Sequence, residues 1–210
     1  MTFSLELPAG PVAEAALSVV RTSESPSIAN HSLRTFFFAQ LTAAHEGCLD
    51  DDAYDRDLLF AATVMHDLGL GDLAPGADRF EVEGADLAAA ALRDHGVPGR
   101  DVDRVWEAIA LHTSAGIAER RGLLAYLTRR GVGIDFGLGV QVVAGQEREI
   151  HAAYPRLAMA RSLADEIVRR ASSSPAAAPP YSLGAGLLLE RQADGITTIE
   201  RAAASSVWAE

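Results

Sequence analysis

Apolar residues recur at helical spacing along almost the whole chain of 210 residues, and no segment alternates convincingly between apolar and polar positions as a half-buried strand does. Proline, glycine and acidic residues divide this pattern into separate helices. We expect helices at about 11–22, 26–46, from a cap at 50–52 to 67, 81–94, 101–112, 119–130, 147–170 (an interruption near Pro155 is left open) and 196–204. The sequence therefore predicts an all-α helical bundle.

The segment 171–180 contains three serines and three prolines, a composition typical of a loop or linker. We therefore expect one domain over residues 1–172. Residues 173–210 then form a linker and a helical extension that packs on this domain or on a partner subunit. The sequence leaves the formation of a homo-oligomer open.

The composition restricts the chemistry. The net charge is −11 and all 18 basic residues are arginine, so a Schiff-base lysine and a P-loop lysine are excluded. The acidic balance argues against nucleic acid or an anionic membrane as a partner and favours a small-molecule substrate. The one cysteine, the lack of a signal-peptide pattern and the lack of a long apolar run favour a cytoplasmic protein without a membrane span.

His66 and Asp67 stand side by side at the polar end of an apolar helical pattern. The spacing from Leu58 and Leu59 places the imidazole on the buried face, where an unsatisfied polar group is costly. A divalent metal would satisfy both side chains, because imidazole and carboxylate are common ligands. The alternative is that Asp67 only helps to end the helix.

Three further polar residues fall near helix ends or on inner faces: His31, His112 and Asp135. Because each comes from a different element, a helical bundle could bring them together with His66 and Asp67 around a metal in its core. Each also has a structural alternative. His31 could bond a neighbouring carbonyl, His112 could be a satisfied core histidine, and Asp135 could belong to a turn.

This order of residues, with Asn30-His-Ser-Leu-Arg34 ahead and a late aspartate behind, resembles the HD-domain superfamily of metal-dependent hydrolases. The segments 78–86 and 105–113 resemble its cyanamide hydratase-like branch. The resemblance spans about residues 30–171 and includes Tyr154-Pro-Arg156.

The resemblance implies that His31, His66, Asp67 and Asp135 are the metal ligands. Such a site holds one divalent ion (Zn²⁺, Fe²⁺ or Mn²⁺) and keeps open positions for water and substrate. The metal would acidify water, and a nearby acid or imidazole would move protons.

Three residues are candidates for catalytic roles beside the metal. His112 occupies a pocket position of the family. Glu81 could assist proton transfer, although Glu83 competes for this role and either carboxylate could cap a helix. Arg34 could contact Asp67 or an anionic substrate, or could form a structural salt bridge.

Two departures from the phosphohydrolase pattern affect the expected reaction. Leu70 stands where many HD phosphohydrolases have a phosphate-binding lysine, and residues 80–83 lack the histidine of two-metal relatives. We therefore expect a lyase that hydrates a nitrile-type carbon, as in the conversion of cyanamide to urea. The alternatives are a phosphohydrolase acting on a nucleotide or small phosphate ester, and a non-catalytic ligand-binding HD module.

Overall fold

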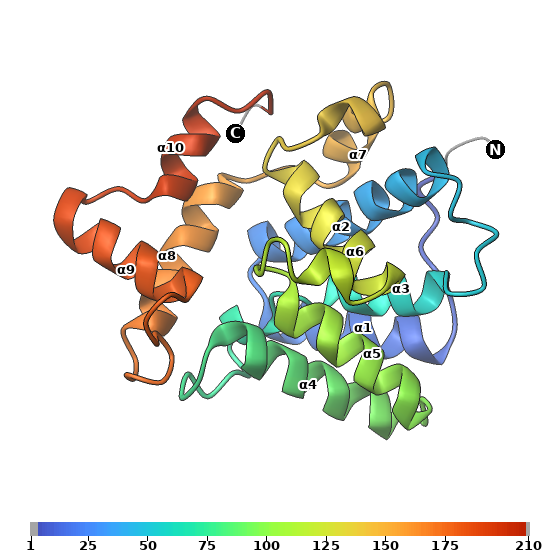
Figure 1. Cartoon of the computed structure of the whole chain (residues 1–210), viewed down its shortest axis with the longest axis horizontal. Coiled ribbons are helices and arrows are strands. Elements are labelled where there is room, and N and C mark those ends of the chain that lie inside the picture. Colours follow the sequence, from blue (N-terminus) through green and yellow to red (C-terminus); the bar gives the residue numbers. More distant parts are fainter. Residues whose placement is uncertain (1–3, 209–210) are drawn as a thin grey trace.

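The computed structural model describes residues 4–208, and this part of the chain contains helices and no strand (Figure 1). The all-α fold expected from the apolar pattern is confirmed. None of the helices described is both long and apolar enough to cross a membrane. The α-helices are α1 (Pro11–Ser23), α2 (Pro26–His45), α3 (Arg56–Val64), α4 (Phe80–Asp94), α5 (Gly99–Leu111), α6 (Leu123–Asp135), α7 (Glu147–Ala153), α8 (Met159–Ala171), α9 (Leu183–Asp194) and α10 (Thr198–Ala204).

Helix α2 lies inside the bundle, between α3 and α6. Its three consecutive phenylalanines, 36–38, are fully buried, which indicates a helix surrounded by other elements rather than one exposed on a face. Phe36 packs edge to face against Phe60 of α3, with ring centroids 5.0 Å apart. The phenylalanine run therefore belongs to the core.

The expected end of α6 at the Gly131–Gly133 break was wrong, because the helix continues through both glycines to Asp135. Gly131 permits a close approach of α6 to α2. A Cβ atom at this position would lie 2.4 Å from the backbone oxygen of Thr35. Gly131 therefore serves helix packing, and Asp135 is the last residue of the helix rather than part of a following turn.

The expected limits of α3 also need correction at both ends. The helix begins at Arg56, and its cap is Asp55 instead of the acidic run 50–52, because the Asp55 side chain accepts hydrogen bonds from the backbone of Asp57 and Leu58. The helix ends at Val64. His66 and Asp67 thus lie in the turn that follows α3, ahead of a short 3-10 helix, Leu68–Leu70.

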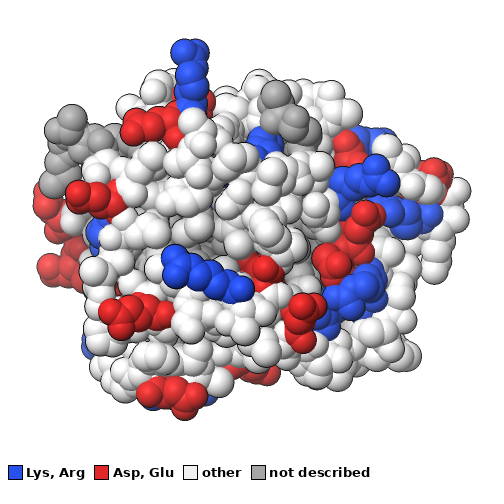
Figure 2. All heavy atoms as spheres, turned by 180° about the vertical axis from the view of Figure 1, so that it is seen from behind, with Lys and Arg blue, Asp and Glu red and all other residues white. Residues whose placement is uncertain are grey.

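The C-terminal helices lie at one side of the bundle, where α9 and α10 both pack on α8 (Figure 1). The segment 147–170 forms two helices, α7 and α8, and the break between them contains Pro155, where the sequence left an interruption open. Helix α9 was not expected from the sequence. Ion pairs such as Arg191–Asp165 and Arg191–Glu200 join α8, α9 and α10, and Figure 2 shows acidic and basic side chains side by side at this edge.

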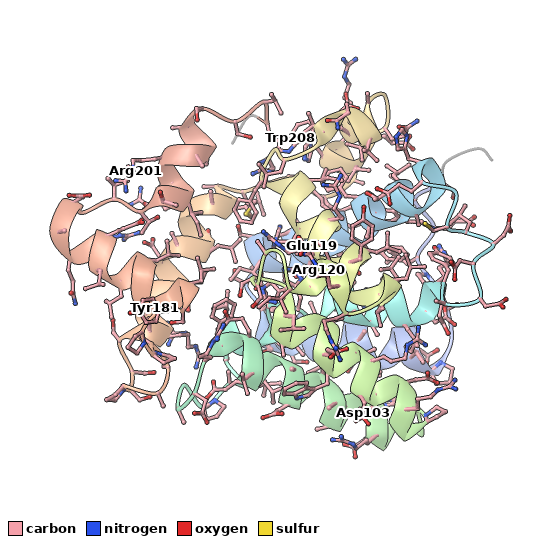
Figure 3. All side chains as sticks on the ribbon, viewed as in Figure 1. Asp103, Glu119, Arg120, Tyr181, Arg201 and Trp208 are labelled. Carbon is pink, nitrogen blue, oxygen red and sulfur yellow. The ribbon has the colours of Figure 1, made fainter. Side chains whose placement is uncertain are left out.

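The described chain ends close to the central helices. The indole of Trp208 stacks on Phe38 of α2, and its Nε1 donates a hydrogen bond to the backbone oxygen of Ile134 at 2.8 Å (Figure 3). The division of the chain at residue 172 stays a prediction, and the outermost residues of the two ranges, 1–3 and 209–210, lie outside the described residues.

Candidate metal centre

The turn after α3 buries His66 and Asp67. Its tight packing depends on Gly69, where a Cβ atom would lie 1.8 Å from the backbone oxygen of Phe80 at the start of α4. The His66 Nε2 atom lies 3.1 Å from Asp67 Oδ2. The imidazole and the carboxylate therefore face the same point instead of projecting apart.

His31 of α2 completes a three-residue group that could hold a metal. Its Nε2 atom lies 3.2 Å from His66 Nε2 and 3.7 Å from Asp67 Oδ2. One potential ligand atom from each of His31, His66 and Asp67 lies within 4.8 Å of the other two, and all three residues are buried. Two imidazoles and a carboxylate are a donor set suited to a divalent transition metal. The residues present therefore fit the ion that the sequence predicts.

The ring nitrogens of His66 and His112 that face away from this group are held by the backbone. His66 Nδ1 lies 2.7 Å from the carbonyl oxygen of Thr63, and His112 Nδ1 lies 2.7 Å from that of Ile109. Because a carbonyl oxygen can only accept, each Nδ1 carries the proton and donates. In the neutral form of each ring, Nε2 then keeps its lone pair, which is the tautomer that binds a metal or accepts a proton.

His112 follows α5 and lies beside Asp67, with 3.7 Å between Nε2 and Asp67 Oδ1. Burial, with a contribution from His66, lowers the pKa of His112 to about 4. The ring is therefore neutral near pH 7. In contrast, although burial disfavours its charged form, the imidazole of His66 holds the pKa of Asp67 well below its usual range.

Asp135 lies on the opposite side of the His31 ring from Asp67. Its Oδ2 atom is 2.6 Å from His31 Nδ1. Arg34 donates to both carboxylate oxygens, from Nε at 2.8 Å and Nη2 at 2.7 Å, and Arg156 Nη1 donates to Oδ1 at 3.0 Å. Asp135 is outside the three-residue group. In this arrangement it orients His31, as a carboxylate behind a metal-binding histidine does. Its role as a direct ligand stays a prediction.

Arg34 is fully buried and forms a structural salt bridge with Asp135, one of the two roles that the sequence left open. Besides Asp135, its Nη1 atom donates to the backbone oxygens of Tyr154 and Pro155. These bonds tie α2 to the end of α6 and to the segment after α7. Arg34 is not among the residues described as lining the pocket beside the site.

Glu81 and Glu83 in the first turn of α4 have different partners. Glu81 accepts hydrogen bonds from Arg79 at 2.9 Å and from the hydroxyl of Thr113 at 2.7 Å, and it is 1% exposed. Glu83 accepts from the backbone nitrogens of residues 76–78. Glu83 therefore holds the preceding loop, whereas Glu81 is linked through Thr113 to the pocket.

A pocket of about 350 Å³ opens beside the three-residue group. Its polar end contains four of the predicted site residues. The complete lining is His31, His66, Asp67, Phe80, His112, Thr113, Arg129, Val132, Gly133, Phe136, Leu138, Leu163, Ile167, Leu183, Thr198, Ile199 and Ala202. The site is thus connected to a cavity that could admit a small molecule, and the helices α8–α10 form part of its wall.

Two parts of the site were not foreseen from the sequence. The first is His151, whose Nε2 atom lies 3.7 Å from Asp135 Oδ1. The rings of His151 and His31 with the Arg34 guanidinium hold the pKa of Asp135 well below its usual value despite burial. The second part is the pocket wall from α9 and α10. His45 and His95 are exposed and do not line the pocket.

A family model described as the HD domain matches residues 28–173, which is more than half of the chain. The chain therefore belongs to the HD domain family. The match contains His31, the His66–Asp67 pair, His112 and Asp135, and it ends before α9. No curated protein matches the chain. Membership implies a superfamily of generally metal-dependent hydrolases, in which some proteins are non-catalytic.

Proposed function

We propose that this protein is a metal-dependent enzyme that uses water to attack a small molecule, and that the reaction is hydration of a nitrile-type carbon, as in the cyanamide hydratase-like branch. One observation carries the proposal. The potential ligand atoms of His31, His66 and Asp67 converge at the buried end of a pocket, beside a neutral imidazole.

A divalent ion, when bound, polarises the substrate and acidifies water so that a nucleophile is available near neutral pH. The protein supplies position and proton transfer. Arg34 and Asp135 fix the ring of His31, and the backbone carbonyls of Thr63 and Ile109 fix the rings of His66 and His112. Apolar side chains form most of the remaining wall of the pocket.

His112 is the proposed proton-transfer residue. Its Nε2 atom faces Asp67 and belongs to a ring that lines the pocket and is neutral near pH 7. In hydration, the oxygen of water bonds to the nitrile carbon, water loses a proton, and the nitrile nitrogen gains one. His112 Nε2 can accept the first proton and return it to the nitrogen. This step gives an imidic acid, and transfer of its remaining hydroxyl proton to the same nitrogen gives the amide, so no oxidant or reductant is needed.

The chemistry of the pocket favours an uncharged reacting group. Leu70, which replaces the phosphate-binding lysine of many relatives, is buried in an apolar cluster with Phe80 and Met159. Among the described residues that line the pocket, Arg129 is the only one with a permanently positive side chain. A phosphate group at the His66–Asp67 end would therefore meet few cations from the protein.

A phosphate ester is the second candidate, and Arg129 is the observation that favours it. The guanidinium is available to an anionic group in the pocket, although Glu119 Oε1 lies 3.9 Å from its Nε atom. The absence of lysine from the whole chain still weighs against this candidate.

The test is an activity assay of metal-loaded protein with cyanamide and, separately, with a panel of nucleoside monophosphates. We expect urea from cyanamide and no phosphate from the nucleotides. His112→Gln should reduce urea formation by about 100-fold, within the range for loss of a general acid–base. His95→Gln, at an exposed position, is the matched control and should be unchanged. Phosphate release without urea would overturn the proposed reaction.

A further inference from the structure

The lining of the pocket has a polar part and an apolar part. The polar part includes His66, Asp67 and His112, and the apolar part includes side chains such as Phe136, Leu163 and Ile167. Leu163 and Ile167 belong to α8 and are only 2% and 4% exposed. Such side chains cannot donate, accept or ligate, so they contribute to the site through the shape and apolarity of the wall.

Part of this wall comes from outside the family match. Leu183 begins α9, and Ile199 and Ala202 lie on α10, whereas the match ends at residue 173. Ala202 is exposed to solvent, which places it at the mouth of the pocket rather than at its base. The C-terminal segment therefore completes a cavity whose reactive end is formed by the HD domain.

The volume of the cavity exceeds what a metal ion and a molecule as small as cyanamide would fill. Pockets of about 300–1,000 Å³ accommodate ligands of drug size, and this one measures about 350 Å³. With only a small molecule at the polar end, most of the apolar wall would stay in contact with water, which is unfavourable.

We propose that the substrate carries an extended apolar body, which lies against α8–α10 while its reactive group lies at His66 and Asp67. The inference rests on the proposed function for the position of the reactive group. The body is uncharged along most of its length, because Asp67 and Arg129 are the only lining residues, among those described, with carboxylate or guanidinium groups, and Asp67 belongs to the metal-ligand group. The charge of Arg129 is offset in part by Glu119 at 3.9 Å.

The direct test measures, by titration calorimetry, the binding of linear primary amides from acetamide to octanamide to the metal-loaded full chain. Amides are the products of nitrile hydration and are stable during the measurement. Burial of a methylene group contributes about 0.8 kcal/mol, so affinity should rise about fourfold with each added methylene until the cavity is filled. An affinity that does not depend on chain length would overturn the inference.

A pair of variants locates the effect. Ala202→Trp introduces a large side chain at the pocket mouth and should reduce the affinity for octanamide at least tenfold while leaving that for acetamide unchanged. Ala204→Trp is the matched control, because Ala204 is also exposed on α10 but does not line the pocket. Both positions are exposed, so neither change should unfold the protein. Equal affinities for octanamide in the two variants would contradict a wall formed by α10.

The same ligands separate this inference from the reaction on which it rests. Turnover of cyanamide and of linear alkyl nitriles is measured beside amide binding. If binding strengthens with chain length but no nitrile is hydrated, the proposed reaction fails and the apolar pocket stands. If cyanamide is hydrated but neither binding nor kcat/KM depends on chain length, the reaction stands and the apolar-body inference fails.

Discussion

The three-residue group of His31, His66 and Asp67 and the wall formed by α9 and α10 line one pocket but are built in different ways. His31 and His66 are fully buried, and their orientation depends on hydrogen bonds from several helices and from the backbone. Helix α10, by comparison, has no buried residue and forms ion pairs with α9, such as that between Glu200 and Arg191. Under the proposed function, the buried network would hold the reactive group and the wall from α9 and α10 would set selectivity, so the wall could change at little cost to folding.

The buried network tolerates charge because each charged group has partners. Arg34, Arg156 and His31 surround Asp135, and Arg34 also donates to backbone oxygens. A buried network in which every member is satisfied is rigid, but removal of one member leaves the others unpaired. Substitutions in this region should therefore affect stability and metal binding together, and substitutions in α9 or α10 should not.

The largest difference between the two regions is expected for glycine substitutions. Gly131→Ala forces a methyl group against the Thr35 backbone, and the free energy of unfolding should fall by about 3 kcal/mol, the upper end for overpacking. Gly186→Ala in α9 meets no atom within 4 Å, and it should raise stability by about 0.5–1 kcal/mol. Urea denaturation of both variants measures the contrast; destabilisation by both changes would contradict it.

Metal binding should raise the free energy of unfolding by an amount comparable to the loss expected for Gly131→Ala. At a free metal concentration of about 100 times Kd, the free energy of unfolding should rise by about 2.7 kcal/mol relative to the metal-free protein. Asp67→Asn should remove this increase, because a ligand carboxylate is lost. Asp103→Asn, at an exposed position of α5, is the control and should retain it (Figure 3). Thermal unfolding with and without metal provides the measurement.

Asp135→Asn distinguishes orientation of His31 from direct ligation. If Asp135 orients the ring, metal affinity should fall about 10–100-fold, as for other residues that hold a ligand. A loss as large as that of Asp67→Asn would instead make Asp135 a ligand, as the family pattern implies, and an unchanged affinity would contradict both roles. Competition with a chromogenic chelator gives the affinity, and circular dichroism verifies that the variant is folded.

The smallest effect is expected at the cap of α10. Thr197 accepts a hydrogen bond from the backbone of Glu200, whose side chain accepts in return from the Thr197 backbone. Thr197→Ala should destabilise α10 by about 1 kcal/mol. Faster hydrogen exchange within 198–204, with unchanged metal affinity, is the expected result. A change in metal affinity would show that α10 is coupled to the buried network.

Most of the fold could be predicted from the sequence because helical periodicity and capping residues are local signals. The limits of α1, α2 and α4 agree with the apolar pattern within two residues. The error at the end of α6 has a tertiary cause. Gly131 was interpreted as a helix breaker, but it serves a close contact with α2, which no local signal reveals.

The sequence was sufficient to predict most residues of the candidate site, but it did not predict how they are arranged in space. The His66–Asp67 pair, His31 and His112 were identified from their order and spacing, and the structure places all four around one pocket. The position of Asp135 behind the His31 ring depends on Arg34 and Arg156, which lie far apart in sequence. The wall from α9 and α10 was equally hidden, because the apolar residues of a pocket resemble those of a core.

The most direct test of the central claim is the metal content of the purified protein after incubation with Zn²⁺, Fe²⁺ or Mn²⁺ and removal of the unbound ion. We predict about one tightly bound divalent ion per chain, its loss in His66→Ala, and its retention in His95→Ala at an exposed position. A parent protein that binds none of the three ions, or a His66→Ala variant that binds as much as the parent, would contradict a metal centre at His31, His66 and Asp67.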